Sequence, residues 1–265
     1  MTLPGAADPG GRSGSGDPSG SGGPRDLSGP GDLSGPGDPD PGPGPAAPFL
    51  YPDPPLRELA GRALALTASG RAVLGVVGEP GAGKSTVADA LLAEVERLRP
   101  GVAAAVSMDG FHLAQRVVDR MGKAATKGAI DTFDAHGFVA LLRRTREETR
   151  QPVWWPEFRR EIEEPVAGAV EVAPRHRLVI VDGNFLLAQD PPWDRVRGLL
   201  TEAWFLDADP AARRRRLAAR YVRYGFAPER ARAKTEGVDE DTSRAIRRGA
   251  GAADLVLREP RGRAG

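Results

Sequence analysis

Apolar runs of strand length alternate with amphipathic segments along most of the chain. Five continuous apolar runs have the length expected of strands buried on both faces of a parallel sheet, at residues 72–77, 102–106, 178–181, 203–206 and 255–257. Between and around them, apolar residues recur at helical spacing over 56–66, 84–98, 138–149, 210–224 and 228–234. This alternation predicts an α/β domain with a mostly parallel five-stranded sheet and helices on both faces.

The pattern is missing from the first 48 residues. Residues 1–48 consist almost entirely of Gly, Pro, Ser and Asp and repeat the sequence DLSGPG at 26–31 and 32–37. Too few apolar side chains are present to offset the entropy of ordering this segment, which predicts a disordered tail. We therefore expect one folded domain over 49–260 and a flexible C-terminus over 261–265.

Composition argues against several classes of function. The net charge is +1, so the chain has no strong field to attract nucleic acid or an anionic membrane. Cysteine is absent, which excludes disulfides and thiolate chemistry. The start has no basic and apolar leader, and no apolar run approaches the ~18 residues of a membrane span, so we expect a cytoplasmic protein. Composition leaves open whether the chain forms a homodimer.

The strongest motif joins the first apolar run to the helix that follows it. The segment GEPGAGKST fits the phosphate-binding pattern G-x-x-x-x-G-K-[ST] at each fixed position, and the predicted nucleotide-binding residues are Gly78, Glu79, Pro80, Gly81, Ala82, Gly83, Lys84, Ser85 and Thr86. The glycines let backbone N–H groups point at phosphate oxygens, and the helix adds its positive N-terminal end. Lys84 would reach the β- and γ-phosphates of ATP, and the Ser85 hydroxyl would bind Mg²⁺. A chance glycine-rich turn is the alternative, but the strand before and the helix after favour a nucleotide site.

Two further predicted strands end in a carboxylate. Asp109 follows 102–106 within the stretch VSMDGFHLA, and Asp182 follows 178–181. Ligands of open parallel sheets bind at the carboxyl ends of the strands, which predicts that both acids lie beside the phosphates. Asp182 would hold Mg²⁺, and Asp109 would orient an acceptor hydroxyl and take its proton. Asp109 and Gly110 could instead form a plain turn, since Asp-Gly is a common turn pair.

Six segments follow one another along the chain: the 78–86 loop, MDGFH (108–112), KGAIDTFD (127–134), PEFRREIEEP (156–165), VDGNFLL (181–187) and RRRRLAARYVRYG (213–225). In this order they resemble the uridine kinase, pantothenate kinase and phosphoribulokinase group, and above all bacterial nucleoside/nucleotide-kinase-like proteins, some labelled fructose-transport-system kinases. The resemblance spans about residues 70–257. It implies a P-loop NTPase fold with ATP and Mg²⁺ as cofactors and a small-molecule hydroxyl acceptor.

The resemblance also implies roles for single residues. Asp109 would be the catalytic carboxylate, and Asp182 would bind the metal where relatives usually have Glu. Lys84 would act with an arginine-rich lid that closes on the phosphates and contains Arg216 and Arg220. On the acceptor side, the implied residues are His112, Lys127, Phe133 and the neighbouring Asp134. His112 could equally be a structural polar group between two loops.

Three positions depart from the family pattern on the acceptor side. Arg159 stands where relatives usually have Asp, Tyr221 replaces a common lid His, and Thr242 replaces an Asn. Because guanidinium binds carboxylate and phosphate groups in a bidentate manner, Arg159 favours an acceptor that carries negative charge. The ATP side keeps the pattern, whereas the identity of the acceptor does not carry over.

Each functional interpretation has a structural alternative. The arginine cluster at 213–216 could be a solvated helix face, and Trp154-Trp155 is expected in the core or a pocket wall, with stacking on a substrate as the alternative. For the whole protein, we expect an ATP-dependent kinase that phosphorylates a nucleoside, a pantothenate-like acid, or a sugar or sugar phosphate. The alternative is a nucleotide-gated regulatory or accessory ATPase that switches a protein partner. The acid at Asp109 and the arginines after 203–206 favour the kinase.

Overall fold

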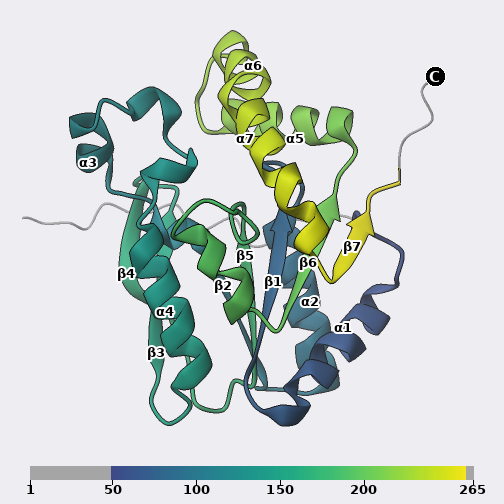
Figure 1. Cartoon of the computed structure of the whole chain (residues 1–265). Helices are drawn as coiled ribbons and strands as arrows, with labels where there is room; N and C mark the ends of the chain where they lie inside the picture. The colour runs from purple at the N-terminus through teal and green to yellow at the C-terminus, as the bar shows by residue number, and fades with distance from the viewer. Residues whose placement is uncertain (1–48, 261–265) are drawn as a thin grey trace, which may run out of the picture. The chain divides into compact units, whose positions relative to one another are not determined.

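Five parallel strands form the central sheet of the protein (Figure 1). The structure is a computed structural model and describes residues 49–260. Across the sheet the order is β2 (Ala103–Ser107), β5 (Leu178–Gly183), β1 (Ala72–Gly78), β6 (Glu202–Asp207) and β7 (Leu255–Arg258). All five predicted strands are therefore confirmed, and all neighbouring pairs are parallel. The predicted tail 1–48 and C-terminus 261–265 lie outside the described residues.

Helices cover both faces of the sheet, as predicted. Side chains alternate along each strand, so β1 gives Leu74 and Val76 to one face and Val73 and Val77 to the other. The first face packs against α1 (Leu56–Ala65) and α2 (Lys84–Leu98). The second face packs against α4 (Ala135–Glu147), which begins earlier than its apolar pattern predicts because the Asp134 side chain accepts a bond from Gly137 N and caps the helix.

An antiparallel hairpin lies on the second face and was not predicted. It consists of β3 (Val153–Arg159) and β4 (Glu164–Val172). Most of β4 is exposed or half-exposed, so its sequence lacks the apolar run that marks the sheet strands. The expectation for the tryptophan pair holds for one member only: the Trp155 side chain is fully buried and its Nε1 donates to Thr145 Oγ1 over 2.8 Å, whereas Trp154 is 53% exposed.

Three helices follow one another at the carboxyl-end side of the sheet, and the last of them runs back toward the start of β7 (Figure 1). They are α5 (Pro210–Arg223), α6 (Pro228–Glu236) and α7 (Val238–Gly249). The first two match the sequence prediction, while α7 and the six-residue α3 (Gln115–Arg120) were missed because few apolar residues mark them. Among residues 49–260, no helix combines the length and apolarity needed to cross a membrane.

Candidate active site

The glycine-rich loop links β1 to α2 through backbone conformations that require glycine. Gly81 and Gly83 have φ angles of +82° and +88°, in the left-handed region that other residues rarely adopt. A Cβ at Gly81 would also lie 2.8 Å from the carbonyl oxygen of Arg213 in α5. The glycines thus allow both the curl of the loop and the close approach of α5, and α2 begins at Lys84 as predicted.

Side chains from three parts of the chain hold this loop by its carbonyl groups. The four successive carbonyls of residues 79–82 each accept one side-chain hydrogen bond. The donors are Lys84 Nζ to Glu79 (3.1 Å), Arg213 Nη1 to Pro80 (3.2 Å), Arg216 Nε to Gly81 (3.0 Å) and the Tyr51 hydroxyl to Ala82 (2.6 Å). Because the protein itself satisfies these acceptors, the loop has a fixed shape, and the N-terminal N–H groups of α2 remain for an anion.

A cavity of about 150 Å³ lies beside the loop and collects the predicted groups. Its walls come from the loop, from the ends of β2 and β5, and from α5. The lining residues are Pro80, Gly81, Gly83, Lys84, Ser85, Thr86, Asp109, Asp182, Asn184 and Arg220. The structure therefore brings together the predicted Lys84, Ser85, Asp109, Asp182 and Arg220. The sequence analysis missed Asn184, although its place just after a strand end is a signal that could have found it.

Asp182 and Ser85 form an oxygen-rich corner of the cavity. The Asp182 side chain is buried, and one of its oxygens accepts a bond from Ser85 Oγ over 2.9 Å. Burial raises the pKa of Asp182, and the nearby Asp109 carboxylate raises it further, while Lys84 lowers it. Carboxylate and hydroxyl oxygens are ligands that suit Mg²⁺, so the residues present fit the implied ion. Among residues 49–260, no group of three or more His, Asp or Glu side chains is arranged to enclose a metal.

Lys84 lines the same cavity as the two acids. Burial lowers its pKa to about 8, although Asp182 and Asp109 oppose the shift. A phosphate chain bound in the cavity would bring further negative charge close to the Lys84 ammonium group and so favour its charged form.

Asp109 occupies a turn and also lines the cavity. It belongs to one turn of 3-10 helix, Met108–Phe111, in which its N–H donates to Ser107 Oγ over 3.2 Å. A Cβ at Gly110 would lie 2.3 Å from the carbonyl oxygen of Pro156, so glycine lets the hairpin approach. The turn interpretation is therefore right about the backbone, while the carboxylate faces the cavity and binds Arg160 Nη2 over 2.8 Å.

The predicted acceptor residues His112, Phe133 and Lys127 differ in their burial and in their contacts. The carbonyl oxygen of Asp109 lies 2.7 Å from His112 Nδ1, and the His112 ring packs on Phe133 with centroids 4.1 Å apart. Phe133 is only 6% exposed, so it is mainly a core residue. Lys127 donates to Gln115 Oε1 and to the carbonyl of residue 163, over 2.8 and 2.9 Å.

Arg159 does not reach this group. Its exposed guanidinium pairs with Glu157 over 2.8 Å, on the same face of β3. The arginine that contacts Asp109 is Arg160, the next residue, which the sequence analysis did not select. A stretch of two adjacent arginines shows that a guanidinium is present but does not reveal which of them faces the site, because that depends on the register of the hairpin.

The predicted lid arginines separate into two groups. Arg220 lines the cavity. Arg216 instead binds Gly81 O and forms two bonds to Glu259, of 2.7 and 2.9 Å. Arg213 is fully buried and lies between Glu79 and Glu240. Glu79 was predicted to cradle phosphate, but its side chain is buried against Arg213 and Arg247, so only its backbone belongs to the nucleotide loop.

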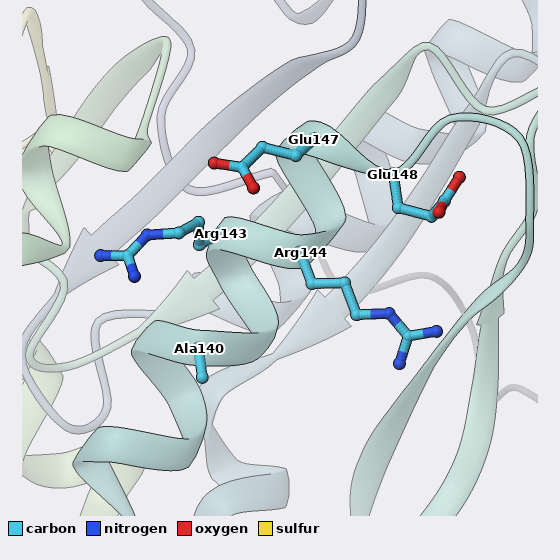
Figure 2. Close-up of a pocket in the computed structure, with 5 residues that line it drawn as sticks. All are labelled: Ala140, Arg143, Arg144, Glu147 and Glu148. Carbon is cyan, nitrogen blue, oxygen red and sulfur yellow. The ribbon is translucent and has the colours of Figure 1, made fainter.

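A second hollow, of about 350 Å³, is not a comparable site. It is lined by Ala140, Arg143, Arg144, Glu147 and Glu148, all from α4 and the residue that follows it. Figure 2 shows that Arg143 and Arg144 point to opposite sides of the helix, so the charged groups do not converge on one ligand. No strand end or glycine loop contributes to it.

A buried strand, a glycine loop pinned by its carbonyls, and acids at the neighbouring strand ends define a P-loop nucleotide-binding α/β protein. A Schizosaccharomyces pombe protein named "Putative uridine kinase" is 34% identical over 162 residues, which are 59% of this chain and 68% of that protein. The Aspergillus versicolor "ATP-dependent kinase-like protein notR'" is 35% identical over 48% of this chain and 78% of its own length. No family model matches the chain.

A solved structure extends the similarity to most of the described residues. A crystal structure from Silicibacter sp. TM1040, titled "putative fructose transport system kinase", is 33% identical, has a TM-score of 0.69, and covers 76% of this chain and 98% of its own. The chain therefore belongs to the uridine-kinase-like family of P-loop small-molecule kinases. It is an ATP-dependent small-molecule kinase, as the sequence analysis expected over the accessory ATPase.

Proposed function

We propose that the protein transfers the γ-phosphoryl group of Mg²⁺-bound ATP to a hydroxyl group of a small molecule held at Asp109. The observation that carries this proposal is the single cavity that joins the phosphate loop to the Asp109 carboxylate. A nucleotide switch needs the loop and a metal ligand, but it has no use for a second acid facing the γ-phosphate position. We also propose that the acceptor belongs to the class expected from the sequence: a nucleoside, a pantothenate-like acid, or a sugar or sugar phosphate.

The chain's own residues supply positioning and charge. Lys84 and the α2 N-terminus bind the phosphate chain, and Arg220 approaches it from α5. Ser85 and Asp182 would hold Mg²⁺, which neutralises phosphate charge when bound. Asp109 accepts a hydrogen bond from the acceptor hydroxyl and aligns its oxygen with the γ-phosphorus.

The reaction exchanges one P–O bond for another. The acceptor oxygen forms a bond to the γ-phosphorus as the bond from that phosphorus to the bridging β,γ-oxygen breaks, and the bond electrons leave with ADP. The hydroxyl proton passes to the Asp109 carboxylate and then to solvent. The products are ADP and the phosphate ester, so no further reactant is needed.

Replacing Asp109 by Asn tests the proposal. Asp109→Asn keeps the size of the side chain and a hydrogen bond but cannot take the proton. We expect kcat with a confirmed acceptor to fall by about 10²–10⁴ while ATP affinity stays close to that of the wild type. Turnover and ATP binding are measured over a Mg²⁺ titration, with Asp194→Asn as the control because Asp194 is an exposed aspartate outside the cavity.

Two results would assign Asp109 another role. If Asp109→Asn weakens Mg²⁺·ATP binding and added Mg²⁺ restores it, Asp109 is a metal ligand rather than the base. If the variant keeps wild-type turnover, Asp109 only closes the turn, since Asn is a good turn residue.

A further inference from the structure

We infer that the acceptor is an anionic alcohol, a molecule that carries a carboxylate or phosphate group besides its reacting hydroxyl, and that Arg160 and Lys127 bind this anionic group. The inference rests on the proposed function, because it takes the hydroxyl to bind at Asp109. It adds the charge of the acceptor and the two residues that select it.

The first observation is the ion pair between Arg160 and Asp109. Its length is 2.8 Å, and the two side chains are 37% and 35% exposed. The guanidinium therefore occupies one oxygen of the carboxylate that the acceptor hydroxyl must reach. Ion pairs this open to solvent contribute little, so a ligand with a suitable anion can replace Asp109 as the partner of Arg160.

The second observation is a neighbouring cation without an acidic partner. Lys127 Nζ donates to an amide oxygen and a backbone carbonyl, and among residues 49–260 no carboxylate lies within 4.0 Å of it. Lys127 and Arg160 both lie over the ring of Phe158, 5.4 and 4.6 Å from its centroid. Two cations thus share one aromatic ring while a single carboxylate, Asp109, pairs with one of them.

The hairpin that carries Arg160 is held against the Asp109 turn. The Pro156 carbonyl approaches Gly110 so closely that no side chain would fit there. The Phe158 ring is 9% exposed and packs on His112, with centroids 4.7 Å apart. Arg160 and Asp109 therefore belong to one rigid surface, and an acceptor can contact both at once.

An anionic alcohol satisfies this surface completely. Its carboxylate or phosphate takes over Arg160 and adds the missing negative charge beside Lys127, while its hydroxyl takes the freed oxygen of Asp109. A neutral alcohol offers Arg160 no anion in exchange for Asp109, so it competes with the guanidinium for the carboxylate and gains no charged hydrogen bond in return. The sequence suggested a negatively charged acceptor because of Arg159. The contacts of the adjacent Arg160 support the same kind of acceptor.

Matched pairs of acceptors test the charge requirement. The pairs are glycerate and glycerol, pantothenate and panthenol, and fructose 6-phosphate and fructose, so each comparison adds a carboxylate or a phosphate to a similar skeleton. Release of ADP is measured with the full-length protein and Mg²⁺·ATP. We expect at least one anionic member to be phosphorylated with kcat/KM at least 10-fold above its neutral partner, and the pair involved distinguishes carboxylate from phosphate.

Variants of the two adjacent arginines test the residue. Arg160→Gln should raise the KM of the preferred anionic acceptor by ~10–100-fold, leave the KM of ATP unchanged, and spare neutral acceptors. Arg160→Lys should recover part of the loss because it keeps the charge without the bidentate geometry. Arg159→Gln serves as the matched comparison, because Arg159 pairs with Glu157 outside the cavity. Thermal unfolding of each variant shows whether it is folded.

Two outcomes would overturn the inference. In one, the wild-type protein prefers the neutral member of every pair or phosphorylates no anionic acceptor. In the other, Arg159→Gln raises the KM of the anionic acceptor as much as Arg160→Gln does. The proposed function is tested separately: if neutral acceptors are phosphorylated and Asp109→Asn abolishes that transfer, the function stands and only the anionic class is wrong.

Discussion

The carboxylate of Asp109 is aimed by its immediate neighbours in the chain. Ser107 accepts the Asp109 N–H and begins the short 3-10 turn, and Gly110 allows the hairpin to close over it. The turn therefore sets the direction of the acid, and the hairpin sets what faces it. Changes at these neighbours should affect catalysis through the position of Asp109 rather than through its chemistry.

His112 gives the fold a pH dependence that can be measured. Burial lowers the pKa of His112 from its ordinary value of 6.5, although Asp109 opposes the shift. Below pH 6.5 the unfolded chain therefore binds more protons at this site than the folded chain, so stability falls as the pH falls. His176 contributes in the same direction because burial also lowers its pKa.

We expect His112→Asn to reduce this acid sensitivity. Asn stays neutral and can still donate to the Asp109 carbonyl, so the drop in Tm between pH 7.5 and pH 5.5 should be smaller than in the wild type. His136→Asn, at an exposed position, is the control and should keep the wild-type drop. An unchanged drop in His112→Asn would show that His112 is protonated equally in both states.

The sequence predicts those site residues whose positions follow from the strand, loop or helix that contains them. Asp182 lies at the end of a buried strand, and Lys84 and Ser85 begin the helix after the loop that follows another, so their meeting in one cavity follows from the parallel sheet. The contacts of Arg216, Arg160 and the Glu79 side chain could not be predicted, because their partners Glu259, Asp109 and Arg247 come from distant segments. The order of the motifs along the chain does not predict side-chain contacts between such distant segments.

Among the elements, the short segment before α1 has an unexpected part in the nucleotide site. Tyr51 is completely buried, and its hydroxyl is the donor to the Ala82 carbonyl of the loop. Gly83 lies close to the same segment, since a Cβ there would be 3.2 Å from Leu50. The loop is thus supported by residues that precede the first helix as well as by α5.

Tyr51→Phe should weaken this support without opening a cavity. The change removes one hydroxyl and leaves the Ala82 carbonyl unpaired, so we expect a loss of about 1–2 kcal/mol in unfolding free energy and weaker ATP binding. Urea unfolding and ATP titration measure the two effects. Tyr224→Phe is the matched control because Tyr224 is 46% exposed. Equal behaviour of the two variants would mean that Tyr51 only fills space.

Among the strands, the sequence predicts those that are buried on both sides. Each strand of the central sheet is a continuous apolar run, and β1 is buried at every position. The hairpin has one face toward solvent, and α7 packs mainly through charged and small residues, so neither leaves a strong apolar pattern. The part of the site contributed by the hairpin was therefore also the part predicted least well.

For the whole molecule, the described residues contain both the core and the complete cavity. We expect a protein that begins at Phe49 to keep the Tm and the kinase activity of the full chain, because the contacts described for the loop begin with the segment at Leu50 and Tyr51. A protein that begins at Leu56 lacks Tyr51 and should have a lower Tm and weaker ATP binding. A large loss already in the first protein would show that residues 1–48 take part in folding or activity.

The central position of β1 has a consequence for synthesis of the protein. β1 and its glycine loop leave the ribosome early, but their two partner strands, β5 and β6, are Leu178–Gly183 and Glu202–Asp207. At translation rates of about 5–20 residues per second, the nascent loop waits several seconds or more for the strands and for the α5 arginines that fix its carbonyls. During this interval the apolar β1 lacks its two partner strands, so we expect the growing chain to depend on chaperones until β6 has emerged. Nucleotide can assist folding only once α5, which ends at Arg223, has followed.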